Sequence, residues 1–119
     1  QMADAEAVCA GLPERADVTY IGLALNRRGA DRALATGRID QVGAVAVASD
    51  AFGIANQSQT SDASVKEAQA IVAAARAAGR SGQVTIAAAF GCPFSGPVNP
   101  GRVVAMAARM AEDAPWEIA

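Results

Sequence analysis

The sequence predicts an α/β protein whose parallel sheet is built from successive strand and helix units. Apolar runs that suit strands alternate with segments whose apolar residues recur at helical spacing. One run, VGAVAVAS, is almost unbroken, as in a strand covered on both faces. Gly and Pro punctuate the junctions between the segments. Strands that alternate with helices imply right-handed crossovers and a parallel sheet.

The first segment, QMADAEAVCAGLPERAD, is expected to be helical and to end at Gly11 and Pro13. Ala3, Ala7, Val8 and Leu12 fall on one face of this helix. The apolar run VTYIGLALN, residues Val18–Asn26, follows as the first strand. The segment RRGADRALATGR is then a short helix closed by Gly37.

The second strand is expected over Val42–Ser49, and the polar segment DAFGIANQSQTSD after it is expected to be a loop. Ser61 or Ser64 can cap the next helix, and Ser64 with Glu67 fits a capping box. The expected buried stripe of that helix is Val65, Ala68, Ile71, Val72 and Ala75.

The third strand is predicted in QVTIAAAF, covered on both faces like the second. Asn99 and Pro100 form a cap and first-turn pair for the last helix. That helix is expected to bury Val103, Met106, Ala107 and Met110, and PWEIA resembles the start of a fourth strand. The predicted strand starts lie near Val18, Val42, Val84 and Glu117.

Two architectures fit this order: an open doubly wound sheet, or part of a (β/α)₈ barrel. The length of 119 residues favours the open sheet, because a full barrel takes about 250 residues. The start within a helix and the stop at a nascent strand favour a single-domain piece of a barrel, residues 1–119.

The composition limits the possible functions. A formal net charge of -2 without a basic cluster argues against nucleic acid or an anionic membrane as partner. No apolar run reaches the roughly 20 residues of a membrane span, so a cytoplasmic protein is expected. The chain has no histidine, which excludes a Ser-His-Asp or Cys-His centre and a His-ligated metal within it. Its two cysteines, Cys9 and Cys92, form no CxxC pair.

Polar residues follow each apolar run at the end where parallel strands place functional groups. Asn26 can bind a ligand or cap the next helix, and Ser49 with Asp50 presents the same two alternatives. Cys92 is either a small buried apolar residue or a catalytic thiol, and a thiol needs a base or cation to lower its pKa. Arg27 and Arg28 suit either a solvated helix start or a phosphate-bearing ligand.

The loop after the third strand, GCPFSGPVNP, is rich in Gly and Pro. Glycine allows positive φ and close backbone approach, while proline stiffens the chain. The loop is therefore expected to hold a fixed shape beside a site.

The segment AAFGCPFSGPVNPGRVV resembles the Gly-Cys-Pro-Tyr/Phe-Glu-Gly segment of the hydroxymethylglutaryl-CoA lyase family. The stretches QMAD, LALNRRGADRALATG and VAVASDAFGIANQSQTSDAS resemble the same family in the same order. The resemblance implies a partial TIM barrel, from about strand 3 to strand 6. It also implies a metal-dependent enzyme that cleaves a 3-hydroxyacyl-CoA by retro-Claisen chemistry, and a homo-oligomer.

With this resemblance, Asn26, Ser49 and Thr85 are expected to bind the acyl-CoA, and Cys92, the candidate catalytic residue, is expected on a loop near the site. It places the ligands of a divalent cation, Mg²⁺ or Mn²⁺, outside this chain, so the chain alone is expected to be inactive. The family often has Tyr where Thr85 stands and Glu where Ser95 stands, so a related acyl-CoA with a different acyl group fits as well.

Three alternatives stay open on the sequence. Another aldolase or synthase of the same barrel superfamily would share the fold. A self-contained flavodoxin-like binding or signalling module would fit the length. A non-catalytic remnant would pack against a partner chain.

Overall fold

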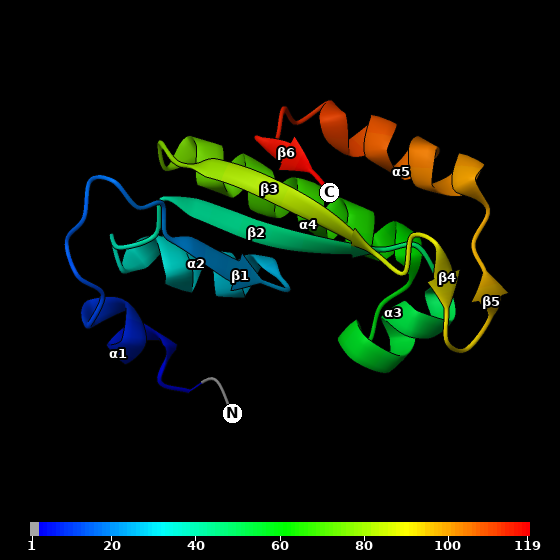
Figure 1. Cartoon of the computed structure of the whole chain (residues 1–119), viewed down its shortest axis with the longest axis horizontal. Helices are drawn as coiled ribbons and strands as arrows, with labels where there is room; N and C mark the ends of the chain where they lie inside the picture. Colours follow the sequence, from blue (N-terminus) through cyan, green and yellow to red (C-terminus); the bar gives the residue numbers. More distant parts are fainter. Residues whose placement is uncertain (1–2) are drawn as a thin grey trace.

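A computed structural model describes residues 3–119, and its main feature is a four-stranded parallel sheet (Figure 1). The strand order is β1-β2-β3-β6, and a second, two-stranded sheet pairs β4 with β5 antiparallel. The strands are β1 (Ile21–Ala24), β2 (Gln41–Val47), β3 (Ser81–Ala87), β4 (Gly91–Cys92), β5 (Gly96–Pro97) and β6 (Glu117–Ile118). The helices are α1 (Ala5–Ala10), α2 (Arg27–Ala35), α3 (Asp50–Gln57), α4 (Ser61–Ala77) and α5 (Pro100–Ala111).

Helix α4 forms the core with β2 and β3. The predicted stripe is confirmed, since Val65, Ala68, Ile71, Val72 and Ala75 are each at most 1% exposed. Gly82 of β3 allows this close packing, because a Cβ there would lie 3.0 Å from Cα of Val72. The strand faces that meet the helices carry small and β-branched side chains such as Val42, Ala44 and Val84.

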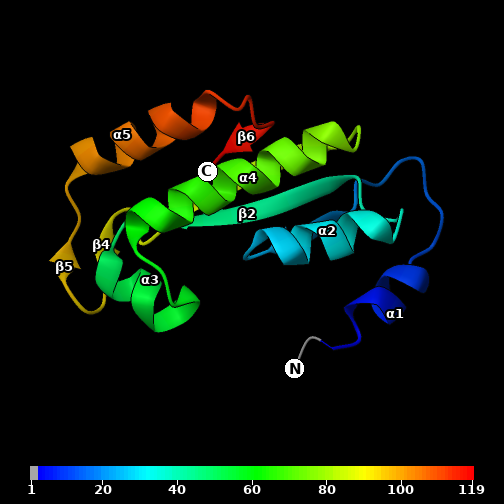
Figure 2. The same cartoon turned by 180° about the vertical axis from the view of Figure 1, so that it is seen from behind.

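Helices α2 and α4 lie on the same side of the sheet. Figure 1 shows the strands in front of α4, and Figure 2 shows α2 and α4 in front of β2. The opposite face exposes apolar side chains, with Leu23 70% and Ile21 50% exposed. A doubly wound sheet has helices on both faces, whereas a barrel wall has them only outside. The one-sided arrangement therefore favours the barrel over the open sheet.

The opening segment differs from the prediction. Helix α1 has only six residues and buries none of them. On the face formed by Ala3, Ala7, Val8 and Leu12, only Leu12 is partly buried. The helix lies beside the sheet rather than on it (Figure 1). It is attached through half-buried Cys9 and through an ion pair of Glu6 with Arg32 at 2.6 Å.

The first strand is shorter than the predicted Val18–Asn26. Before it, the backbone N–H of Tyr20 donates to Asp40 Oδ2 at 2.8 Å instead of joining a strand ladder. After it, Asn26 already caps α2. The third strand likewise stops at Ala87 instead of continuing to Phe90, because Ala88 turns into the left-handed region with φ 57°.

The third strand is also covered on one face only, contrary to the prediction. Its residues alternate, with Val84 and Ile86 buried against the helices and Thr85 exposed on the other face. The second strand is more fully buried, as predicted.

The polar segment predicted as a loop contains helix α3. Ser49 accepts from the backbone N–H of Phe52 as its cap, and Ser58 ends it in the left-handed conformation with φ 55°. Helix α4 is capped by Thr60, whose side chain accepts from Ala63 N, so neither Ser61 nor Ser64 is the cap. Ser64 is instead fully buried and bonds to Val47 N and Ser61 O.

The end of the chain follows the prediction closely. Asn99 caps α5, accepting from Gly101 N at 2.8 Å, and Pro100 is its first residue. Met106 and Met110 are buried, while Val103 and Ala107 pack against the core from half-buried positions. The nascent strand is β6, which pairs with β3. None of the helices in residues 3–119 combines the length and the apolar character that crossing a bilayer requires.

Candidate functional site

The candidate site lies at the carboxyl-terminal edge of the parallel sheet. Because β1, β2 and β3 are parallel, Asn26, Ser49 and Cys92 all follow strands that end at this edge. Ser49 comes two residues after β2, and Cys92 lies in the small hairpin that follows β3. The Gly-Pro loop thus has a defined form, an antiparallel pair in which Cys92 faces Gly96.

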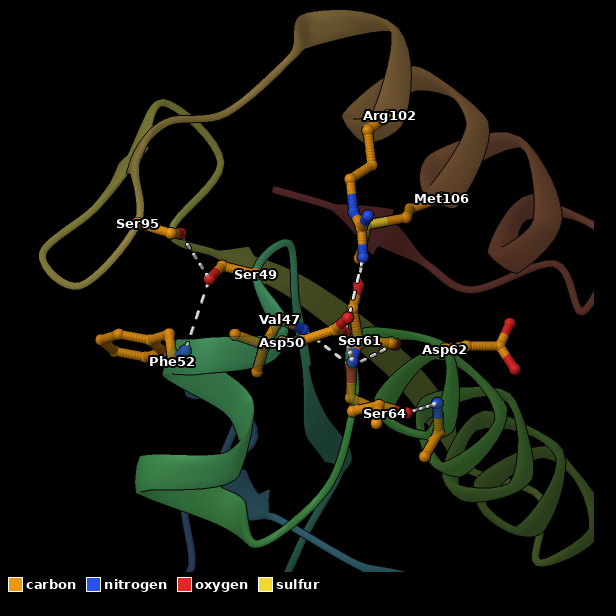
Figure 3. A network of polar contacts seen from close by, with 12 residues as sticks. Val47, Ser49, Asp50, Phe52, Ser61, Asp62, Ser64, Ser95, Arg102 and Met106 are labelled. Atoms are coloured by element: carbon orange, nitrogen blue, oxygen red, sulfur yellow. Dashed lines mark hydrogen bonds and ion pairs between the residues drawn. The ribbon is translucent and has the colours of Figure 1, made fainter.

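A cluster of three side chains joins the two loops. The Ser49 hydroxyl donates to Cys92 Sγ at 3.0 Å and lies 3.2 Å from Ser95 Oγ. Ser49 and Cys92 are buried, 6% and 5% exposed. Figure 3 shows Ser49 between Ser95 and Phe52. One hydroxyl therefore caps α3 and also holds the hairpin against the end of β2.

The Cys92 thiol is in an environment that favours ionisation. Burial alone would raise its pKa, but hydrogen bonds from Ser49 and Ser95 and from the backbone N–H groups of Phe94 and Ser95 outweigh it. Together they lower the pKa of Cys92 from 9.0 to about 7. The groups that lower this pKa are neutral hydrogen-bond donors and not the base or cation that the sequence analysis considered.

Asp50 links the starts of three helices next to this cluster. Its Oδ1 accepts from Ser61 N at 2.7 Å and lies 3.6 Å from Nη2 of Arg102 in α5 (Figure 3). A cavity of about 380 Å³ lies between these loops, with Ser49, Asp50, Ser95 and Arg102 in its lining. Asp50, the first residue of α3, thus connects this helix to the starts of α4 and α5 at the edge of the cavity.

The other two predicted substrate-binding residues lie apart from the cluster. Asn26 Oδ1 accepts from Gly29 N at 2.9 Å, so of its two alternatives the structure shows the helix cap. Thr85 lies in the middle of β3 on the helix-free face. Within residues 3–119, no hydrogen bond connects Asn26 or Thr85 to Ser49 or Cys92.

The sequence analysis considered Ser95 only as a departure from the family's Glu, without predicting its contact with Ser49, and it did not identify Arg102. Ser95 had a usable signal, since it shares a six-residue loop with Cys92. Arg102 had none beyond its place in the first turn of a helix, because its partner Asp50 is 52 positions earlier.

The described residues do not form a metal site. In residues 3–119 no group of three or more His, Cys, Asp or Glu side chains is placed to hold a cation. A second cavity, of about 410 Å³, lies near Tyr20 and Asp40, and its charged residues are engaged in ion pairs such as Arg38 with Glu14.

The chain resembles enzymes of one kind along nearly its whole length. It is 32% identical over 118 residues to a protein from Danio rerio named 3-hydroxy-3-methylglutaryl-CoA lyase, cytoplasmic; the match covers 99% of this chain and 35% of that protein. It is 32% identical, also over 118 residues, to the 3-hydroxy-3-isohexenylglutaryl-CoA/hydroxymethylglutaryl-CoA lyase of Pseudomonas aeruginosa, covering 99% of this chain and 39% of that protein.

The same kind of enzyme appears among solved structures. An HMG-CoA lyase from Acinetobacter baumannii, solved in complex with coenzyme A and 3-methylmalate, superposes with a TM-score of 0.88 at 28% identity. The match covers 98% of this chain and 37% of that one. The chain is homologous to hydroxymethylglutaryl-CoA lyases. No family model matches it.

The homology to the lyases confirms the partial TIM barrel and excludes the flavodoxin-like alternative for the fold. It also explains the helix-free face, which corresponds to the inside of a barrel wall. The chain spans 35% to 39% of the length of the two relatives named above.

Proposed function

We propose that the protein containing this chain is a carbon–carbon lyase that cleaves a 3-hydroxyacyl-CoA similar to hydroxymethylglutaryl-CoA. The observation that carries the proposal is the homology to such lyases over 99% of the chain. In the reaction the C2–C3 bond breaks and its electron pair goes to C2, which takes up a proton. The C3 hydroxyl loses its proton and becomes a carbonyl. The products are acetyl-CoA and a keto acid.

The chain would contribute the substrate-binding rim of this enzyme. Ser49, held in place by Cys92 and Ser95, is proposed to contact the acyl-CoA through its hydroxyl. Asn26 keeps its amide nitrogen for the same ligand while its oxygen caps α2. Cys92 is proposed to shape the rim rather than to act as the nucleophile, because its side chain is buried and is not part of the cavity lining that contains Ser49 and Ser95.

A divalent cation, Mg²⁺ or Mn²⁺, is proposed to assist the reaction as a Lewis acid, held by groups outside this chain. The 119-residue chain by itself is therefore proposed to be inactive. The enzyme is proposed to be a cytoplasmic homo-oligomer. Another aldolase or synthase of the same barrel superfamily remains the alternative.

The test is a cleavage assay on the full-length protein with hydroxymethylglutaryl-CoA and Mg²⁺ or Mn²⁺. We expect equal amounts of acetyl-CoA and the keto acid. Ser49→Ala should lower kcat/KM about tenfold, as expected for one lost hydrogen bond, whereas Ser58→Ala at the other end of α3 should leave it unchanged. Failure to cleave any 3-hydroxyacyl-CoA would contradict the proposal, and condensation instead of cleavage would favour the synthase.

A further inference from the structure

The hydrogen bonds among Ser49, Cys92 and Ser95 have one consistent set of directions. The Ser49 hydroxyl donates its proton to Cys92 Sγ at 3.0 Å, and the same sulfur accepts from Phe94 N at 3.4 Å. A serine hydroxyl has a single proton and two acceptor lone pairs. Because the proton of Ser49 is already used, Ser95 is the donor in the 3.2 Å contact between the two serine oxygens.

Ser95 therefore presents an acceptor to the outside of the cluster. Its own proton points towards Ser49, and within residues 3–119 no group donates a hydrogen bond to its oxygen. Ser95 is exposed and lines the cavity of about 380 Å³ at this edge of the sheet. Ser49 lines the same cavity but is only 6% exposed, and without a free proton it too can meet a ligand only as an acceptor.

The position of Ser95 is fixed before any ligand binds. The pair of Cys92 with Gly96 closes the hairpin around it, and Gly96 makes the turn with a φ of 78°. The neighbouring Phe94 packs against Phe52 of α3, with ring centroids 6.3 Å apart. An acceptor held in this way loses little conformational entropy when a ligand binds to it.

An acceptor at this place selects a ligand that carries a hydrogen-bond donor. In an acyl-CoA, the N–H nearest the reacting end belongs to the pantetheine amide that a short ethylene arm joins to the thioester sulfur. The C3 hydroxyl is the other donor near the thioester, but its proton must leave during cleavage. The neutral oxygen of a serine is too weak a base to take that proton.

We propose that Ser95 binds the acyl-CoA by accepting a hydrogen bond from the pantetheine amide N–H nearest the thioester. This inference rests on the proposed lyase function. No bond is made or broken at this amide during cleavage, so the hydrogen bond is equally strong in the bound substrate and in the transition state. Its loss should therefore raise KM and leave kcat nearly unchanged.

The test compares hydroxymethylglutaryl-CoA with an analogue whose amide nearest the thioester is replaced by an ester, on the full-length enzyme. The ester keeps the carbonyl and the chain length and lacks only the N–H. Ser95→Ala should raise KM about tenfold for the amide substrate, as expected for one hydrogen bond, and by less than about twofold for the ester. Ser95→Thr, which keeps the acceptor oxygen, should retain the wild-type KM for both.

Wild type should itself have a KM about tenfold higher for the ester than for the amide, and this comparison needs no variant that folds. An equal wild-type KM for both substrates would overturn the inference. A KM that Ser95→Ala leaves unchanged, or raises equally for both, would overturn it too, because a purely structural role in the hairpin acts on either substrate. Failure of the wild type to cleave any 3-hydroxyacyl-CoA, in amide or ester form, would instead overturn the proposed function.

Discussion

At the scale of single residues, the notable feature is how much depends on the Ser49 hydroxyl. It accepts from Phe52 N, donates to Cys92 Sγ and contacts Ser95 Oγ. Sequence reasoning identified Ser49 and Cys92 individually as candidates. It could not pair them, because they are 43 positions apart and only the parallel arrangement of β2 and β3 brings their loops together.

Ser49→Ala should raise the pKa of Cys92 from about 7 towards its ordinary value of 9.0, because the thiolate loses a hydrogen-bond donor. Thiolate absorbance measured against pH checks this, with Ser49→Thr as the variant that keeps the hydroxyl. Cys92→Ser should remove the transition near pH 7, and Cys9→Ser should leave it in place. An unchanged midpoint in Ser49→Ala would contradict the assigned hydrogen bond.

The same shift has a consequence for stability. The folded-state pKa of Cys92 lies below the value of a free thiol. Ionisation of Cys92 therefore adds stability that is fully present above about pH 9 and is lost as the pH falls through about 7. Comparing the unfolding of wild type and Cys92→Ser across this window would isolate the contribution.

At the scale of elements, sequence reasoning succeeded where apolar spacing decides the structure and failed where local polar contacts do. The buried stripe of α4 and the Asn99 cap of α5 follow directly from spacing and composition. Helix α3 was missed because its polar residues resemble a loop, and its stability depends on contacts beyond the segment. One is the packing of Phe52 against Phe94, with ring centroids 6.3 Å apart.

The prediction that Ser61 or Ser64 caps α4 was wrong for a similar reason. The pattern at Ser64 and Glu67 satisfies a capping box, yet Ser64 lies in the core and accepts from Val47 N at 2.9 Å. Glu67 instead accepts a hydrogen bond from Arg27 N. Both partners come from other elements, so the local pattern could not reveal them.

Gly53 of α3 gives a sharp test of the observed helix. A Cβ there would lie 2.5 Å from the carbonyl oxygen of Gln59, so Gly53→Ala should lower the free energy of unfolding by about 1–3 kcal/mol. Gly29 of α2 is the matched control, since its Cβ would meet only ordinary contacts of 3.5 Å or more. Gly29→Ala should raise stability by about 0.5–1 kcal/mol. Denaturant unfolding measures both, and equal effects would contradict the described turn after α3.

At the scale of the whole molecule, the sheet has one covered and one open face. Val42, Ala44 and Val84 are at most 1% exposed on the helix side, whereas Ile21 and Leu23 are at least half exposed on the other. The sequence indicated that strands and helices alternate, but it did not indicate which face of the sheet the helices cover. Both faces of β1 carry apolar residues, so its pattern fits helices on either face. Comparison with the lyase barrels resolves this, since their closed ring buries the inner face.

The open face predicts how the 119-residue chain behaves alone. Exposed apolar strand surface promotes association, so the isolated chain should self-associate, as measured by sedimentation velocity over a concentration series. Leu23→Lys should reduce the association, because a charge on this face must be desolvated in any contact that buries it. Val104→Lys, at a site 67% exposed on α5, is the matched control and should have little effect. A wild-type chain that stays monomeric at all concentrations, or a control that dissociates it equally, would show that the inner face of the barrel wall does not govern association.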